Sequence, residues 1–384
     1  MSYPVAVIGA GLSGLRAADI LSSAGHTVML VESRLRLGGR ILSEGLSAPG
    51  LPHQLDLGPS WFWPDMNPLM SGLVDGLGLT HYAQHTDGGL RYEAEGSPVR
   101  TLPDSWAHQP AAHRVRGGMG AVVKAMEARL AGRVSIHLDT QLTGLSLLPN
   151  AVELSLKDGR GVWKQRASHV VLAYPSRLIA SQLQLEPGLD QQTLGALQAN
   201  PTWMAPHAKF AALYDRPFWR DQGLSGMAIS HRGPLGEIHD ASDPQGQQGA
   251  LFGFFSAPAS YRRQQEPGNL ERLALEQLVR LFGPLAAHPR RVWLQDWSQE
   301  PFTADAADQW PTPHPMYRPV HIPSPWQGRL FLAGTEQAEL SGGLLEGALE
   351  AGEKAAHAVI SQARAMMRPH AVLDEKLADA APAP

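Results

Sequence analysis

The chain has 384 residues, no cysteine and a formal net charge of −4, from 32 Lys and Arg against 36 Asp and Glu. This length suggests two domains or one large domain with a substantial core. The absence of cysteine excludes disulfides, thiolate metal ligands, a cysteine nucleophile and a thioether link to a cofactor, and the balanced charge does not indicate nucleic-acid binding.

Residues 5–32 are predicted to form a strand–helix–strand unit around a glycine-rich turn. Val5–Ile8 is an apolar run typical of a buried parallel strand, and leucine and alanine then recur at helical spacing up to Gly25. Gly9, Gly11 and Gly14 occupy the turn in the order GxGxxG. In this context the first glycine permits a tight turn, the second lets the backbone approach a pyrophosphate, and the third allows close helix–strand packing.

The turn and the end of the second strand are predicted to bind a dinucleotide. The helix begins at Leu12 and Ser13, where free N–H groups and the positive end of the helix dipole suit phosphates. Glu32 ends the strand HTVMLVE, where it suits both ribose hydroxyls and repels a 2′-phosphate, which disfavours NADP. A plain glycine-rich connection is the simpler alternative, but the complete strand–helix–strand context favours the dinucleotide site.

A second glycine pair follows the second strand. Ser33 and Arg34 lead to Gly38, Gly39 and Arg40, whose N–H groups and guanidinium suit the same pyrophosphate. With an acidic strand end followed by Arg and then by Gly-Gly-Arg, the chain resembles the flavin-containing amine oxidase family. This resemblance implies FAD rather than NAD as the cofactor.

The resemblance extends to further segments. Residues 55–64, LDLGPSWFWP, resemble the family segment that passes beside the isoalloxazine ring, and residues 116–122, RGGMGAV, resemble the segment that returns the chain to the FAD domain. Residues 328–360 resemble the last motif, a strand, a glycine turn and a long helix whose first N–H groups face the pyrimidine edge of the flavin. The resemblance implies further cofactor contacts from Leu57, Gly58, Pro59, Ser60, Thr140, Gly334, Glu336, Gly343, Leu344 and Leu345.

Lys209 is the predicted catalytic lysine. It begins the strand in HAKFAALYDRPFW, residues 207–219, and matches a family lysine that holds a water beside the flavin N5. A lysine at that place stabilises the negative charge that develops on reduction. Composition alone would favour an exposed strand lysine, as most lysines are.

Some positions depart from the family pattern. Ala306 stands near the position of the cysteine that links FAD in some members, so FAD is expected to be non-covalent. Two aromatic residues that flank the substrate in amine oxidases correspond to Ala307 and Leu344, so that cage is missing. Trp61 and Trp297 are predicted to supply aromatic walls, which attract an apolar or cationic amine. Further aromatic candidates are Trp63, Trp203 and Trp310.

The predicted fold class is α/β, with a doubly wound, Rossmann-type FAD-binding domain and a smaller α+β substrate domain that contains a mixed sheet. The FAD domain is expected at 1–80, 116–200 and 296–365, the substrate domain at 81–115 and 201–295, and a flexible tail at 366–384. In the substrate domain, strands are predicted near 251–256 and 291–297, and a helix over 270–283.

The predicted function is oxidation of an amine, in which hydride passes from carbon to the flavin N5 and dioxygen reoxidises the flavin to give hydrogen peroxide. An FAD-dependent desaturase or isomerase acting on a carbon skeleton is the alternative, because the aromatic cage is missing. A protein that carries FAD without catalysis is a third interpretation. The expected partners are a small amine and dioxygen; no metal, nucleic acid, membrane span or secretory signal is predicted, and a cytoplasmic location is the default.

Overall fold

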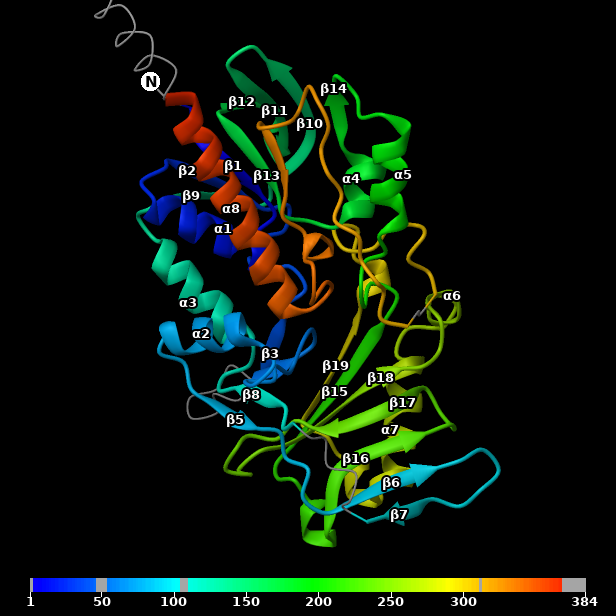
Figure 1. Ribbon diagram of the computed structural model, residues 1–384. Coiled ribbons are helices and arrows are strands. Elements are labelled where there is room, and N and C mark those ends of the chain that lie inside the picture. Colours follow the sequence, from blue (N-terminus) through cyan, green and yellow to red (C-terminus); the bar gives the residue numbers. More distant parts are fainter. Residues whose placement is uncertain (1–2, 46–53, 104–109, 311–312, 368–384) are drawn as a thin grey trace, which may run out of the picture.

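The computed structural model describes residues 3–45, 54–103, 110–310 and 313–367 (Figure 1). A parallel sheet with its helices forms the upper part of the molecule in Figure 1, and a larger mixed sheet forms the lower part. The long helix α8 (Leu345–Met367) packs beside α1 (Leu12–Ser23) in the upper part.

A parallel sheet forms the centre of the upper part. Among the described residues its strand order is β20-β13-β1-β2-β9, and every neighbouring pair is parallel. Its strands are Val5–Ile8 (β1), Val28–Val31 (β2), Val134–His137 (β9), His169–Leu172 (β13) and Leu330–Leu332 (β20). The first strand lies in the middle, as doubly wound dinucleotide folds require, so the predicted Rossmann-type sheet is confirmed.

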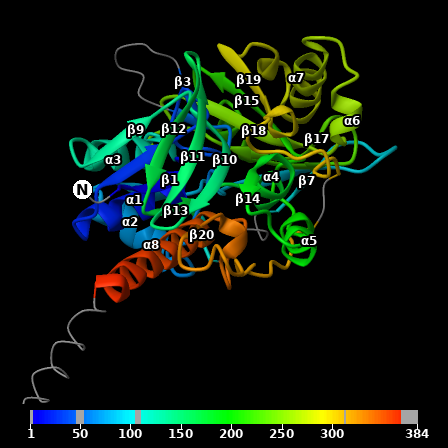
Figure 2. The same ribbon diagram turned by 90° about the horizontal axis from the view of Figure 1, so that it is seen from above.

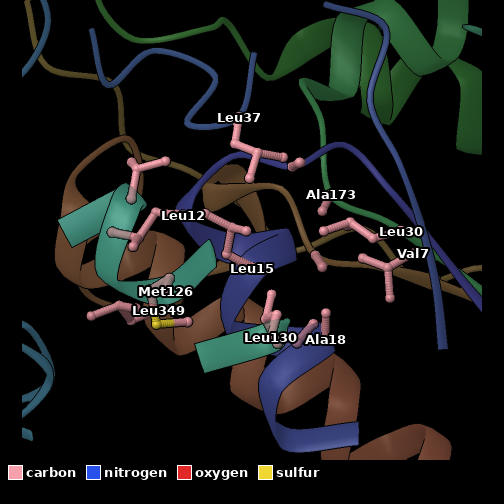
Figure 3. Packing of buried hydrophobic residues seen from close by; sticks show 14 of the residues in the cluster. Val7, Leu12, Leu15, Ala18, Leu30, Leu37, Met126, Leu130, Ala173 and Leu349 are labelled. Atoms are coloured by element: carbon pink, nitrogen blue, oxygen red, sulfur yellow. The ribbon is translucent and has the colours of Figure 1, made fainter. Parts of the chain in front are cut away.

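Both faces of this sheet are covered, which explains why its strands are apolar at nearly every position. Val7 and Leu30 pack with Leu15 against α1, α8 and α3 (Gly120–Leu130) (Figure 3). Ala6 and Ile8 face the other side, where a small sheet covers them (Figure 2). Burial of each large apolar side chain contributes about 1.5–3 kcal/mol, so this sandwich fixes the position of the glycine turn that follows β1.

The covering sheet has the order β12-β11-β10-β14 within the described ranges, with β10, β11 and β12 antiparallel and β14 parallel to β10. Its strands are Gln141–Leu148 (β10), Ala151–Asp158 (β11), Gly161–Ala167 (β12) and Gln184–Glu186 (β14).

The lower part is a mixed sheet with the order β19-β15-β18-β17-β16-β6-β7 in the described chain. Its strands are Gly89–Glu93 (β6), Arg100–Leu102 (β7), Ala208–Tyr214 (β15), Leu224–Ser230 (β16), Leu235–Asp240 (β17), Gly249–Phe255 (β18) and Arg291–Asp296 (β19). Among the described strands of this sheet, only the pair β16–β6 is parallel, which confirms a mixed sheet. The predicted strands near 251–256 and 291–297 are β18 and β19, and the predicted helix is α7 (Asn269–Phe282).

Strand β15 has two apolar faces with different partners. Phe210 and Ala212 point to α7, together with Leu278. Ala211 packs on the other face against Leu57, in the segment 55–61. Because strand side chains alternate, Lys209 lies on the face that meets this segment, which brings it to the predicted flavin site.

The remaining described elements connect these sheets. They are Ser43–Gly45 (β3), Gln54–Asp56 (β4), Pro68–Gly76 (α2), His81–Ala83 (β5), His113–Val115 (β8), Ser176–Gln182 (α4), Gln191–Ala199 (α5), Ala259–Arg262 (α6) and short 3₁₀ turns at Arg220–Gln222, Pro284–Ala287, Trp297–Gln299 and Thr335–Gln337. Strand β3 pairs with β4, and β5 pairs with β8. The domain boundaries stay a prediction, and residues 368–384 of the predicted tail lie outside the described residues.

Candidate FAD and substrate site

The three glycines of the turn differ in what surrounds them. Gly9 has a φ of +97°, and a Cβ there would lie 2.6 Å from the carbonyl oxygen of Ala173. A Cβ on Gly14 would collide with the carbonyl oxygen of Gly9. A Cβ on Gly11 would meet no described atom within 4 Å, although this glycine lines a large cavity. Gly9 and Gly14 are therefore required by the protein itself, whereas the space beside Gly11 is open to the cavity and has room for a ligand.

Glu32 ties the glycine turn to the following loop. Its carboxylate is buried and accepts hydrogen bonds from the backbone N–H groups of Ala10, at 2.8 Å, and Arg34, at 2.9 Å. Both oxygens keep a second lone pair, so the side chain still has capacity for the hydroxyl donors of a ribose. The predicted ribose contact remains a prediction.

The second glycine pair lies directly against the first turn. Gly38 donates to the carbonyl oxygen of Ala10 at 2.8 Å and forms a parallel bridge with Gly11. Arg40 donates to the carbonyl oxygen of Trp203 at 3.0 Å, which fixes the guanidinium at the cavity wall. This arrangement places a cation and a glycine-rich backbone beside the open space at Gly11.

Glu336 is the least satisfied carboxylate near the cavity. It is fully buried, and neither carboxylate oxygen has a hydrogen-bond partner among the described residues. Burial raises its pKa, and the nearest cation, Arg40, is 3.8 Å away and partly offsets this effect. A buried carboxylate without donors needs them from elsewhere, and the ribityl hydroxyls of FAD are donors of that kind. The open space at Gly11 fits the predicted cofactor, whereas Glu336 does not line the cavity itself, although its neighbours Gly334 and Thr335 do, and its cofactor contact stays a prediction.

Lys209 is buried and makes specific contacts. Its Nζ donates to the carbonyl oxygen of Gly58 at 3.0 Å and to the hydroxyl of Ser60 at 2.6 Å, and it lies 3.9 Å from the centre of the Phe252 ring. Burial lowers the pKa of Lys209 to about 7, with the charge of Asp56 opposing the shift. The side chain is therefore not an exposed strand lysine, and with a pKa of about 7 it is present in both its charged and its neutral form near pH 7.

The aromatic walls are held in place by hydrogen bonds. The indole N–H of Trp61 donates to Gln84 at 2.7 Å, and that of Trp297 donates to the carbonyl oxygen of Leu57 at 3.0 Å. Both tryptophans line the cavity, together with Trp63 and Trp203. Trp310, the remaining candidate, is 64 % exposed and does not line it.

These parts surround one cavity of about 600 Å³. Its described lining includes the predicted catalytic residues Lys209, Trp61 and Trp297 and the predicted cofactor residues Gly9, Gly11, Leu12, Ser13, Glu32, Ser33, Arg34, Gly39, Arg40, Leu57, Gly58, Pro59, Ser60, Gly334, Gly343, Leu344 and Leu345. Gly14, Thr140 and Glu336 lie outside this lining.

Two predicted contacts, those of Thr140 and Leu344, stay predictions, and both residues already use a donor group within the protein. The Thr140 hydroxyl donates to the carbonyl oxygen of Leu138, and its neighbours Gln141 and Leu142 line the cavity instead. The N–H of Leu344 donates to the carbonyl oxygen of Ser341 at 3.1 Å, so it is already engaged. Leu345 is the first residue of α8, and a helix provides no acceptor of its own for that N–H.

Some lining residues were not selected from the sequence. His207 precedes Lys209 by two positions, so strand periodicity alone placed it on the same side. Phe254 lies opposite Lys209 in the β15–β18 register, which no local pattern specifies. Tyr174, Met204 and Glu237 come from loops or from the exposed part of a strand, where the sequence carries no comparable signal.

Comparison with known proteins decides the family. Residues 89–360 match the flavin-containing amine oxidoreductase family, and residues 7–77 match the NAD(P)-binding Rossmann-like domain. The chain belongs to the flavin-containing amine oxidoreductase family. It is an FAD-dependent oxidoreductase, and FAD is held without a cysteinyl thioether because the chain contains no cysteine.

Relatives of this flavin-dependent enzyme are distant but match along most of the chain. It is 24% identical to the probable flavin-containing monoamine oxidase A of Dictyostelium discoideum over 91% of this chain and 96% of that protein. It is 26% identical to the putrescine oxidase of Kocuria rosea over 79% of this chain and 83% of that protein. The solved cyclohexylamine oxidase from Brevibacterium oxydans has the same fold, with a TM-score of 0.78, 23% identity and coverage of 95% of this chain and 100% of that one. Within the described residues, no helix is both long and apolar enough to cross a bilayer.

Proposed function

We propose that this family member oxidises a small amine and uses dioxygen as the final acceptor. When bound in the cavity beside the glycine turn and Lys209, FAD would supply the redox chemistry, as an acceptor for hydride from the carbon next to the amine nitrogen and a donor of both electrons to dioxygen, which would become hydrogen peroxide. The amine loses a hydride and a proton and becomes an imine, which water hydrolyses. Neutral amines need no dedicated base for this step, which agrees with a site built from a lysine and aromatic rings.

One observation carries this proposal: the buried amine of Lys209 shares a cavity with the glycine turn and with fixed aromatic rings. The contacts of Lys209 to Gly58 and Ser60 orient its Nζ, and its pKa of about 7 lets it hold or release a proton near neutral pH. Trp61 and Trp297, fixed by their indole hydrogen bonds, provide apolar walls that exclude water and bind an amine.

The test is anaerobic mixing of the FAD-loaded enzyme with primary, secondary and polyamines. Bleaching of the flavin band near ~450 nm, followed by hydrogen peroxide formation when air is admitted, is the expected result. Lys209→Met should slow the reaction with the acceptor or the amine by roughly 10²-fold, as loss of an oriented charge in an active site does. Lys124→Met, on an exposed position of α3, is the matched control and should react like the parent.

A protein that binds FAD but is bleached by no amine would contradict the proposal and favour a desaturase or isomerase. Equal rates for Lys209→Met and the parent, with every donor and with dioxygen, would exclude the role given to Lys209.

A further inference from the structure

Three charged side chains from separate parts of the chain are buried close to one another. Lys209 lies on β15, Asp56 ends β4, and Arg114 lies in β8. Each of these residues is only 2% exposed. Asp56 comes two positions before Gly58, whose carbonyl oxygen accepts from the Nζ of Lys209 at 3.0 Å. One short segment therefore holds the carboxylate next to the lysine.

The carboxylate of Asp56 uses its two oxygens differently. Its Oδ1 accepts from the hydroxyl of Ser43 at 2.6 Å and from the N–H of Met119 at 2.8 Å. Its Oδ2 has no hydrogen-bond partner among the described residues, and a guanidinium nitrogen of Arg114 lies 3.9 Å from it. Burial raises the pKa of Asp56, and both cations and both hydrogen-bond donors oppose this rise. The donors and the cations thus favour the ionised carboxylate.

The charges of this pair act on Lys209 in opposite directions. Burial lowers the pKa of Lys209 to about 7, the negative charge of Asp56 opposes the shift, and the positive charge of Arg114 adds to it. The contacts of Nζ with Gly58 and Ser60 orient the amine but carry no charge. A neighbouring charge changes a pKa by about 1–3, so removal of either partner is expected to change the protonation of the lysine near neutral pH.

Other charged groups on the elements around β15 have partners of their own. Asp296 on β19 accepts two hydrogen bonds from Arg262. Glu237 on β17 is hydrogen-bonded to His239 at 2.6 Å. Directly opposite the lysine, β19 places the uncharged Gln295.

The remaining neighbours of Lys209 are uncharged near pH 7. On β18, the ring centres of Phe252 and Phe254 lie 3.9 and 5.4 Å from Nζ. Burial lowers the pKa of His207, in the same cavity, to about 4. Burial also raises the pKa of Tyr82 on β5. The buried carboxylate and guanidinium are therefore the charges that act most directly on the lysine.

We propose that Asp56 and Arg114 are positioning residues that set the charge of Lys209, and with it the pH range in which the reduced enzyme passes electrons to dioxygen. Asp56 favours the protonated amine, and Arg114 limits this effect because it faces the same carboxylate. A charged Lys209 stabilises the negative charge that develops as electrons leave for dioxygen. Control of the lysine rests on contacts within the protein, whereas its link to dioxygen rests on the function proposed above.

The first test measures the protonation of Lys209 in the cofactor-free protein. Lysine labelled with carbon-13 at Cε gives a resonance that is absent from Lys209→Met, and its chemical shift is followed against pH. Asp56→Asn should lower the midpoint by about one pH unit or more, and Arg114→Gln should raise it, because they remove charges of opposite sign. Arg114→Lys keeps the positive charge and should return the midpoint towards that of the parent. Arg116→Gln, at an exposed position just beyond β8, should titrate like the parent.

The second test follows the reaction with dioxygen in the FAD-loaded enzymes. The flavin is reduced with dithionite, so that no amine is needed, and is then mixed with dioxygen at a series of pH values. The rate should fall as the pH rises through the midpoint of Lys209, and Lys209→Met should lose this dependence. The midpoints of Asp56→Asn and Arg114→Gln should shift in the directions found by carbon-13. A merely structural role would lower the rate without moving the two midpoints in opposite directions.

Unchanged midpoints of Lys209 in folded Asp56→Asn and Arg114→Gln, or shifts in the same direction, would overturn the proposal. If Asp56→Asn fails to fold, the titrations of Arg114→Gln and Arg114→Lys decide. If the carbon-13 midpoints shift as expected but the dioxygen rates do not follow them, control of the lysine stands and the link to dioxygen fails. If both tests succeed but no amine reduces the flavin, the amine oxidation fails and this proposal stands.

Discussion

Replacing Gly11 by alanine is expected to weaken FAD binding without destabilising the protein. The backbone at Gly11 has φ −70° and ψ 179°, which alanine adopts freely, and its Cβ would meet no described atom within 4 Å. Alanine at such a site stabilises the fold by about 0.4–1 kcal/mol, because it restricts the unfolded chain. The same methyl would occupy the space proposed for the pyrophosphate, and loss of one charge-assisted hydrogen bond, about 1.5–3 kcal/mol, would raise the Kd for FAD roughly 10–150-fold.

Gly14→Ala is the matched control with the opposite expected result. Its Cβ would collide with the Gly9 carbonyl oxygen, so the helix or the turn must shift, at about 1–3 kcal/mol or more. Urea unfolding of the cofactor-free proteins, followed by circular dichroism, measures stability, and quenching of FAD fluorescence measures affinity. A parental Kd for Gly11→Ala would show that the pyrophosphate does not pass Gly11. A marked loss of cofactor-free stability in the same variant would show that the space beside it is not open.

Three further substitutions test the buried charges and a helix cap. Glu336→Gln should make the cofactor-free protein more stable at pH 7, because burial raises the pKa of the carboxyl group. The contribution of Glu336 to the free energy of unfolding is therefore present below pH 4.5 and is lost as the pH rises. Urea midpoints with the same pH dependence in both proteins would contradict this. In the parent, the free energy of unfolding should rise between pH 7 and 10.5, because the unfolded chain binds a proton there that folded Lys209, with its pKa of about 7, has released. Lys209→Met should flatten this rise. The same rise in the variant would refute the burial of Lys209. Asp190→Ala should lower the free energy of unfolding by about 1 kcal/mol in urea, because the Asp190 carboxylate caps α5 by accepting from the N–H of Thr193 at 2.7 Å. Gln192→Ala on the same turn should lower it little. Equal losses in the two variants would argue against the helix cap.

The flavin half of the site could be predicted because its signals are local in the chain. Glycine spacing, a buried strand and a terminal carboxylate lie within residues 5–32, and each follows from backbone geometry or from contact with a phosphate. The helix α7 and the strands β18 and β19 were likewise visible as periodic patterns. The resemblance to one family linked these separate segments in one order, and the glycine at position 11, open to the cavity, agrees with that interpretation.

Residues that meet across the fold could not be predicted in the same way. The register of β15 against β18 sets Phe254 opposite Lys209. The backbone N–H of Leu344 donates to the carbonyl oxygen of Ser341. Trp310 was a further aromatic candidate without a family match, and it is exposed. These outcomes depend on strand pairing and loop packing, which join residues far apart in the sequence.

The sequence by itself determined the cofactor class and the parallel sheet, because both follow from short-range patterns whose physical requirements are strict. Tertiary structure alone decided which side chains line the cavity. It buried Lys209 on the face of β15 that meets Gly58 and Ser60, where its Nζ donates to both. Burial is a property of three-dimensional packing, and it shifts the pKa of a lysine side chain such as Lys209.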